Sequence, residues 1–264
     1  MTADRVAFVR RPSPRLAEGL VTHIERTAAV DPALALRQWQ GYCDALTAAG
    51  FALHEVAPAP TCPDSVFIED PLLTFGDLAV VAAPAAASRV PEVPGAQDAA
   101  VRHGLRVVRL EDAPVGGTIA LDGGDVLRVG EVAYVGVGGR TTTAGAEALA
   151  RHLADVDITV VTRPVRTTLH LKSQVTALPD GTVVGYEPLV DSASSWPSFL
   201  AVPEPEGAHV VVLDPGTVLM SDAAPASAAM FRSRGLRVIT VAISEFIKLE
   251  GCVTCLSVRQ HTFD

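Results

Sequence analysis

Residues 125–161 read DVLRVGEVAYVGVGGRTTTAGAEALARHLADVDITVV, and this stretch contains one complete unit of the predicted fold. Two short stretches rich in β-branched residues, DVLRV at 125–129 and VAYVGV at 132–137, are typical of paired strands. A helix-like run follows at Thr143–Ala154, and DITVV at 157–161 then predicts a third strand. The unit is therefore strand, strand, helix, strand.

The same pattern recurs along the chain. Helix-like runs lead through Gly50, Gly104 and Gly235 into the strands FALHEV, LRVVRL and LRVITV. Glycine suits a helix C-terminus because it adopts the left-handed conformation without a Cβ clash. Further strands are expected in LLTFG, LAVVAA and HVVVL, and VTALPDGTVVGY predicts a hairpin that turns at residues 179–181.

These repeats predict the architecture. Roughly five units of similar length suggest modules arranged radially or in a line. An open α/β sheet with crossover helices explains the same alternation, and periodicity alone leaves both readings open. No low-complexity linker divides residues 1–264, so one domain is expected.

Composition excludes several classes of function. The 264 residues are 48% hydrophobic and carry a formal net charge of -9, which argues against a general nucleic-acid binder. Neither a signal-peptide core nor a membrane-spanning run is visible in the sequence. We therefore expect a cytoplasmic protein whose cysteines, Cys43, Cys62, Cys252 and Cys255, are reduced.

The C-terminal stretch GCVTCLSVRQ carries the first candidate for chemistry. In strand geometry Cys255 lies on the polar face, opposite Leu256 and Val258. Two buried core cysteines are the common alternative. A thioredoxin-like redox pair is disfavoured because the motif enters a strand rather than a helix, and zinc lacks a second ligand pair.

The stretch TTLHLKSQV alternates in the same way, with His170 on its polar face. A single histidine is more often structural than functional. A cysteine and a distant histidine are nevertheless the minimal set for thiolate chemistry, because the histidine can protonate a leaving group and then activate water.

Two further stretches carry carboxylates. CPDSVFIEDP places Asp64, Glu69 and Asp70 around Phe67, a set that could hold a planar cation between acids and a ring. A solvated turn is the alternative, and strict alternation would send Glu69 and Asp70 to opposite faces. In LDGGDVL the glycines before Asp125 predict a tight turn that could let the backbone approach a ligand closely.

Taken in order, PDSVFIEDP, SRV, LDGGDVL, GGRTTTAGAE, LHLKS and TCLS closely resemble the dimethylarginine dimethylaminohydrolases over almost the whole chain. This family has the pentein fold, an α/β five-bladed ββαβ propeller with pseudo-fivefold repeats. The resemblance therefore implies that residues 1–264 form a single catalytic domain of this kind.

The resemblance also implies roles for individual residues. Cys255 corresponds to the nucleophile, His170 to the general acid/base and Asp122 to a third catalytic carboxylate. The substrate-binding positions are Leu20, Asp64, Phe67, Glu69, Asp70, Arg89, Arg140 and Leu249. Among these, the two arginines would clamp the substrate α-carboxylate, and the two leucines would offer backbone carbonyls.

The implied reaction hydrolyses a C–N bond of asymmetric dimethylarginine or monomethylarginine, giving citrulline and the methylamine through a thiouronium adduct. It needs neither a metal nor an organic cofactor, its partner is a small molecule, and a homodimer is possible. An arginine deiminase is the nearest alternative enzyme, and a non-catalytic binder of arginine-like cations is the alternative from another class.

Overall fold

The computed structural model describes residues 5–26 and 28–260. Its strands form five separate three-stranded sheets. In every sheet the middle strand pairs antiparallel with one neighbour and parallel with the other. This repeated pairing is the predicted unit, and it confirms five modules rather than one open sheet.

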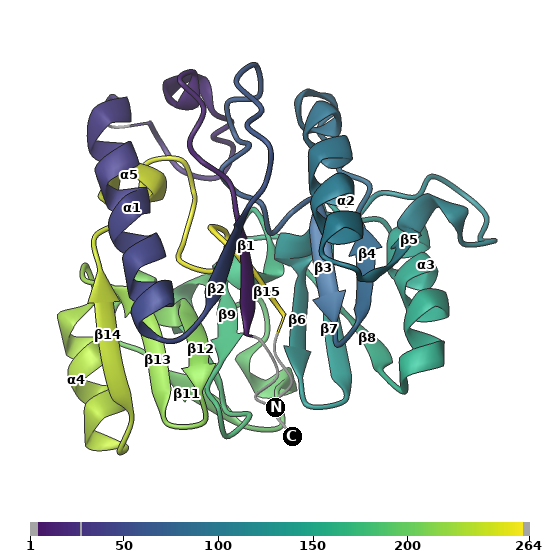
Figure 1. Ribbon diagram of the computed structural model, residues 1–264. Coiled ribbons are helices and arrows are strands. Elements are labelled where there is room, and N and C mark those ends of the chain that lie inside the picture. The colour runs from purple at the N-terminus through teal and green to yellow at the C-terminus, as the bar shows by residue number, and fades with distance from the viewer. Residues whose placement is uncertain (1–4, 27, 261–264) are drawn as a thin grey trace.

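The sheets follow the order of the chain, except that the first one also contains the last strand. They are β1 (Val6–Val9) with β2 (Ala52–Glu55) and β15 (Val258–Gln260); β3 (Leu72–Phe75), β4 (Leu78–Val81) and β5 (Arg106–Arg109); β6 (Val126–Val129), β7 (Val132–Val137) and β8 (Thr159–Pro164); β9 (Val175–Ala177), β10 (Val183–Gly185) and β11 (Phe199–Ala201); β12 (Val210–Asp214), β13 (Thr217–Ser221) and β14 (Arg237–Val241). Figure 1 shows β1 and β15 side by side, so the two ends of the chain close one sheet.

Helices span four of the five parallel connections. They are α1 (Pro32–Ala48), α2 (Val93–Arg102), α3 (Thr143–Leu153) and α4 (Pro225–Ser233), and a fifth short helix, α5 (Ser244–Ile247), follows β14. Between β10 and β11 the described chain has only single 3₁₀ turns, at Glu187–Leu189 and Ala193–Ser195. The glycines after α1, α2 and α4 have φ values of 89°, 83° and 88°, as their sequence positions predict.

Five buried apolar clusters join neighbouring sheets and close the ring. Phe8 packs with residues of the second sheet, Val80 with the third, Tyr134 with the fourth and Val184 with the fifth. A last cluster brings Leu219 of the fifth sheet against the first sheet and α1. The core is therefore a circular set of interfaces, as expected for a propeller.

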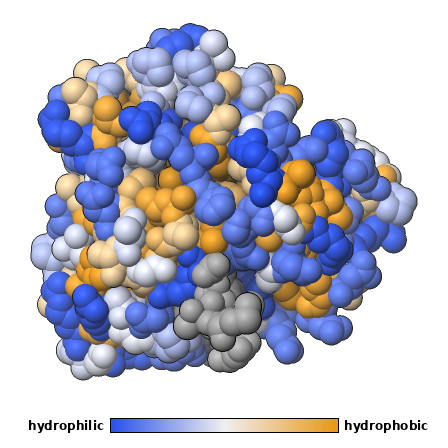
Figure 2. All heavy atoms as spheres, in the orientation of Figure 1, coloured by the Kyte–Doolittle hydropathy of each residue, from blue (hydrophilic) through white to orange (hydrophobic). Residues whose placement is uncertain are grey.

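The surface is mixed in polarity on the face shown in Figure 2. Among the described residues, no helix is both long and apolar enough to span a bilayer. Figure 2 shows hydrophilic and hydrophobic residues interspersed over the visible face.

Two segments that were predicted as strands are turns, and residues 62–71, for which both a strand and a turn were open, are turns as well. Residues 62–71 form successive turns, His170 precedes a 3₁₀ turn at Leu171–Ser173, and Cys255 lies in a turn before β15. Their backbone groups bind one another or side chains rather than a neighbouring strand: Glu69 N–H donates to the Cys255 carbonyl at 3.3 Å. The predicted strand faces of Cys255 and His170 were therefore wrong, although both residues still reach one site.

Candidate active site

The predicted site residues converge on one pocket formed by loops from different parts of the ring. Its lining residues are Leu20, Asp64, Phe67, Asp70, Arg89, Arg140, Leu169, His170, Leu249, Glu250, Gly251 and Cys255. Two predicted residues, Asp122 and Glu69, are not among them. Asp122 lies behind His170 and binds its ring. Glu69 forms an ion pair with Lys172, with 2.5 Å between Glu69 Oε1 and Lys172 Nζ.

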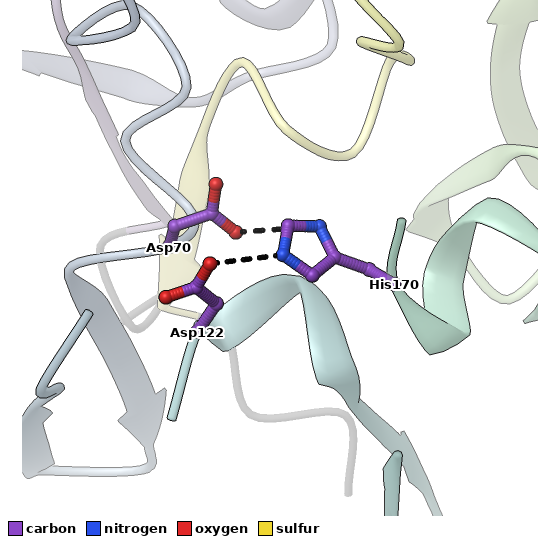
Figure 3. A group of neighbouring side chains, drawn as sticks. All are labelled: Asp70, Asp122 and His170. Atoms are coloured by element: carbon purple, nitrogen blue, oxygen red, sulfur yellow. Dashed lines mark hydrogen bonds and ion pairs between the residues drawn. The ribbon is translucent and has the colours of Figure 1, made fainter. Parts of the chain in front are cut away.

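His170 is held by carboxylates on two sides. Its Nε2 lies 3.0 Å from Asp122 Oδ2, and its Nδ1 lies 3.9 Å from Asp70 Oδ1. Figure 3 shows both carboxylates pointing toward the ring. Burial disfavours the charged imidazole, but Asp70 and the hydrogen bond to Asp122 outweigh it and raise the pKa of His170 to about 9. At neutral pH the side chain is therefore an imidazolium, a proton donor.

The glycine pair in LDGGDVL allows this close approach. A Cβ on Gly124 would lie 2.5 Å from His170 Nδ1 and 2.8 Å from Asp70 Oδ1, and the Gly124 N–H donates to Asp70 Oδ1 at 2.9 Å. Next to it, Asp125 accepts from Leu171 N–H at 2.9 Å and fixes the turn after His170. Burial raises the pKa of Asp125 to about 6.

Arg89 is almost fully engaged within the protein. It binds Glu92 through two nitrogens, at 3.1 and 2.7 Å, and a third nitrogen donates to Asp70. It also donates to the carbonyls of Asp64 and Phe67 at 3.2 and 3.0 Å. A guanidinium has five N–H donors, so few remain for a ligand.

Arg140 is free by comparison. In the described part of the chain its nearest charged partner is Asp122, at 3.8 Å, and its side chain makes no hydrogen bond. It lines the same pocket with 13% of its side chain exposed. The two predicted clamp residues therefore differ: Arg140 can take up a carboxylate, whereas Arg89 mainly orders the acids around it.

Cys255 lines the pocket as a partly exposed thiol. Its Sγ lies 3.4 Å from the Sγ of Cys252, which is buried behind it. The hydrogen bond with Cys252, burial, and the nearby charges of Glu69 and Asp70 raise the pKa of Cys255 well above its usual range. Without a cationic ligand, Cys255 is therefore a neutral thiol.

A short N-terminal segment borders the pocket through Leu20. Leu20 N–H donates to Asp64 Oδ1 at 3.0 Å, and the Glu250 carboxylate accepts from the backbone of Thr22 and His23 at 2.7 and 2.6 Å. We call residues 16–26 the lid. The free space in the pocket is about 20 Å³, close to what a single water molecule needs. A substrate as large as arginine therefore requires the lid to move.

Three side chains of the site are close enough to hold a metal ion. Ligand atoms of Asp70, Asp122 and His170 lie within 4.8 Å of one another. The surrounding charges favour an ion-pair network instead, because Asp70 accepts from Arg89 and Gly124 while Asp122 accepts from a histidine whose pKa is about 9. A metal would have to displace these protons and cations.

Comparisons with known proteins identify the family of the chain. Residues 63–200 match the family model described as arginine deiminase. A protein from Streptomyces coelicolor, named N(G),N(G)-dimethylarginine dimethylaminohydrolase, is 52% identical over 256 residues, which are 97% of each chain. The chain belongs to the dimethylarginine dimethylaminohydrolase family.

More distant relatives support the membership and the fold. The Pseudomonas aeruginosa family member is 29% identical over 96% of this chain and 98% of its own. Its cysteine-to-serine variant in complex with citrulline superposes with a TM-score of 0.86 at 26% identity, covering 98% of this chain and all of that one. A histidine-to-glycine variant of a family member, captured as an adduct with S-methyl-L-thiocitrulline, gives 0.87 at 25% identity, covering 97% of this chain and all of that one. The pentein fold is thereby confirmed.

Sequence reasoning missed several residues that shape the site. Glu92 and Glu250 occur outside every motif used above, and only folding brings them to Arg89 and to the lid. Lys172 stands two residues after His170, yet nothing in the alternation predicts its ion pair with Glu69. The functional roles of the predicted residues remain predictions.

Proposed function

We propose that this protein hydrolyses asymmetric dimethylarginine and monomethylarginine to citrulline and the corresponding methylamine, as a single cytoplasmic catalytic domain. One observation carries the proposal: a thiol and a carboxylate-held imidazolium, Cys255 and His170, line the same acid-lined pocket. Membership of the family and the citrulline complex of a relative support the choice of substrate.

Binding of the guanidinium prepares the nucleophile. Asp64 and Asp70 offer carboxylates in the pocket, and Phe67 adds an aromatic edge or face. Because the hydrogen bond with Cys252, burial and the nearby carboxylates keep Cys255 protonated, a bound cation beside the sulfur lowers the pKa of Cys255 toward the thiolate. The substrate charge thus activates the group that attacks it.

His170 then supplies both proton transfers. The Cys255 thiolate attacks the guanidinium carbon, and the departing amine takes the proton of the imidazolium. The neutral imidazole next removes a proton from water, which attacks the thiouronium carbon and releases citrulline and the thiolate. Asp122 acts as a positioning residue, because its hydrogen bond at 3.0 Å orients the ring and favours its protonated form.

The amino-acid end of the substrate is read near the lid. Arg140 has free donors for the α-carboxylate, and Arg89 supports that end mainly by ordering Asp70 and the chain around Phe67. Leu20 and Leu249 offer backbone carbonyls for the α-ammonium group. Movement of the lid admits the substrate, since the pocket has space for little more than water.

An arginine deiminase is the second candidate, because the matching family model carries that description. A Mycobacterium avium arginine deiminase is 29% identical, but the match covers only 59% of its length. Parallel citrulline assays with asymmetric dimethylarginine, monomethylarginine and arginine decide between them. Arginine as the best substrate would overturn the proposal, and no turnover despite binding would favour a cation binder.

His170→Ala separates an enzyme from a binder. The variant keeps the acidic pocket, so it should still bind the cationic substrate, with some adduct accumulating on Cys255 while steady-state turnover collapses. Intact-mass spectrometry beside a citrulline assay measures both effects. Near-normal turnover by this variant would refute the assigned proton carrier.

A further inference from the structure

Cys252 has no part in the proposed chemistry, yet its sulfur contacts the proposed nucleophile. The two Sγ atoms are 3.4 Å apart, and both cysteines are reduced. A disulfide bond is about 2.05 Å long, so an approach of about 1.3 Å brings the sulfurs to bonding distance. No other two cysteine sulfurs come into contact in the described part of the chain.

The surrounding turn holds the pair in this arrangement. Thr254, between the two cysteines, donates its hydroxyl to Glu69 at 2.9 Å and lies 3.3 Å from Cys252 Sγ. The Cys255 carbonyl accepts from Glu69 N–H at 3.3 Å. Gly251 packs so closely on Phe67 that a Cβ would clash with the ring. Both thiols are therefore fixed by contacts with residues far away in the sequence.

Access to the two sulfurs is unequal. Cys255 lines the pocket, whereas Cys252 is 5% exposed and lies behind it. The pocket has space for a molecule of the size of water, and hydrogen peroxide is only slightly larger. A small oxidant therefore meets Cys255 first, and the nearest group that can react with the oxidised sulfur is Cys252.

We propose that Cys252 is the resolving thiol of a peroxide-dependent modification site, in which a reversible Cys252–Cys255 disulfide blocks the nucleophile. Cys255 loses its proton as its sulfur attacks one oxygen of hydrogen peroxide, and the leaving hydroxide takes up that proton, which yields the sulfenic acid and water. Cys252, losing its proton, attacks that sulfur and releases the second water. Two thiols and one peroxide thus give one disulfide and two waters, and an external dithiol reverses the reaction.

The disulfide competes with irreversible damage. A sulfenic acid without a partner is oxidised further to the sulfinic acid, which dithiols do not reduce. A thiol 3.4 Å away traps it first. Cys252 therefore turns a destructive reaction at Cys255 into a switch. Only the loss of activity depends on the proposed function, and disulfide formation itself does not.

A single tryptic peptide tests the proposal directly. Cleavage after Lys248 and Arg259 releases residues 249–259, which contain both cysteines. After a brief treatment of the native protein with hydrogen peroxide and blocking of free thiols, this peptide should be about 2 Da lighter than the untreated, unalkylated form. Dithiothreitol should restore it to two alkylatable thiols. Citrulline release should fall by roughly tenfold or more and recover together with the thiols.

Matched variants identify the resolving residue. Cys252→Ser should lose the disulfide and the recovery with dithiothreitol, and its peptide should gain about 32 Da, the mass of two oxygens. Cys62→Ser, which removes a buried cysteine outside the pair, should respond like the parent. The proposal would be overturned if a sulfinic acid were the first product in the parent. It would also be overturned if dithiothreitol fully restored citrulline release in peroxide-treated Cys252→Ser. A disulfide that forms in a protein without citrulline release would instead contradict the proposed function alone.

Discussion

Replacing Asp122 by asparagine tests how the site controls the proton of His170. The pKa of His170 is about 9, against 6.5 for an unperturbed histidine. Since one pKa unit corresponds to about 1.4 kcal/mol, the folded protein favours the imidazolium by roughly 3 kcal/mol. A hydrogen bond to a charged group contributes about 1.5 to 3 kcal/mol. Asp122→Asn should therefore lower the pKa of His170 by about 1 to 2.

The same substitution should change the pH dependence of stability. Because the folded pKa of His170 is raised, its contribution to the free energy of unfolding is complete below pH 6.5 and is lost as the pH rises through 9. Asp122→Asn should reduce this loss by about 1.5 to 3 kcal/mol. The reduction should appear as a flatter curve of unfolding free energy between these two pH values.

Two measurements check the reasoning. Side-chain ¹⁵N–¹H NMR of the imidazoles from pH 5 to 10 follows His170 directly, and His170→Gln identifies its signal. Urea unfolding across the same range gives the stability curve. Asp180→Asn is the matched control, because it neutralises an exposed carboxylate in the 179–181 hairpin turn. An unchanged titration of His170 in Asp122→Asn would refute the proposed effect of Asp122 on the pKa of His170.

Three further substitutions test other parts of the site. Cys255→Ser should reduce citrulline release by on the order of a thousandfold or more without unfolding the protein, whereas Cys252→Ser should retain most activity; the reverse result would reassign the nucleophile. Arg140→Lys should raise KM by roughly tenfold with little change in kcat, because lysine lacks the bidentate fork, and steady-state kinetics showing a loss in kcat alone would contradict this. Glu250→Gln should speed amide exchange in the lid by roughly tenfold, because a neutral acceptor binds the two lid amides less strongly; unchanged exchange in mass spectrometry would show that Glu250 does not hold the lid.

The repeating units could be predicted from the sequence because their signals are local. A helix, a glycine and a β-branched run lie within a short stretch, so α1 and β2 follow from residues 32–55 alone. The hairpin at residues 179–181 is equally local, and Gly181 has the expected positive φ of 82°. Closure of the ring by β15 against β1 depends on the two ends of the chain, and only the family resemblance implied it.

The turns of the site could not be predicted because their geometry is set by distant partners. Alternation in a strand would place Cys252 and Cys255 on opposite faces, three residues apart. In the turn their sulfurs are 3.4 Å apart, because Glu69 binds the turn from another part of the chain. In the same way, the engagement of the Arg89 guanidinium within the protein depends on Glu92, which no pattern in SRV reveals. Residue type identified the chemistry, but the three-dimensional contacts decide which group is free to perform it.

The lid and the substrate are linked through one carboxylate, and this link explains how a closed pocket can select a cation. Asp64 accepts the Leu20 N–H at 3.0 Å, while burial raises the pKa of Asp64. Under the proposed function, the same carboxylate receives the guanidinium. Charge-assisted hydrogen bonds are roughly twice as strong as neutral ones, so a guanidinium competes for this contact more strongly than an uncharged side chain does. Binding of a cation then compensates for the lost contact between the lid and Asp64.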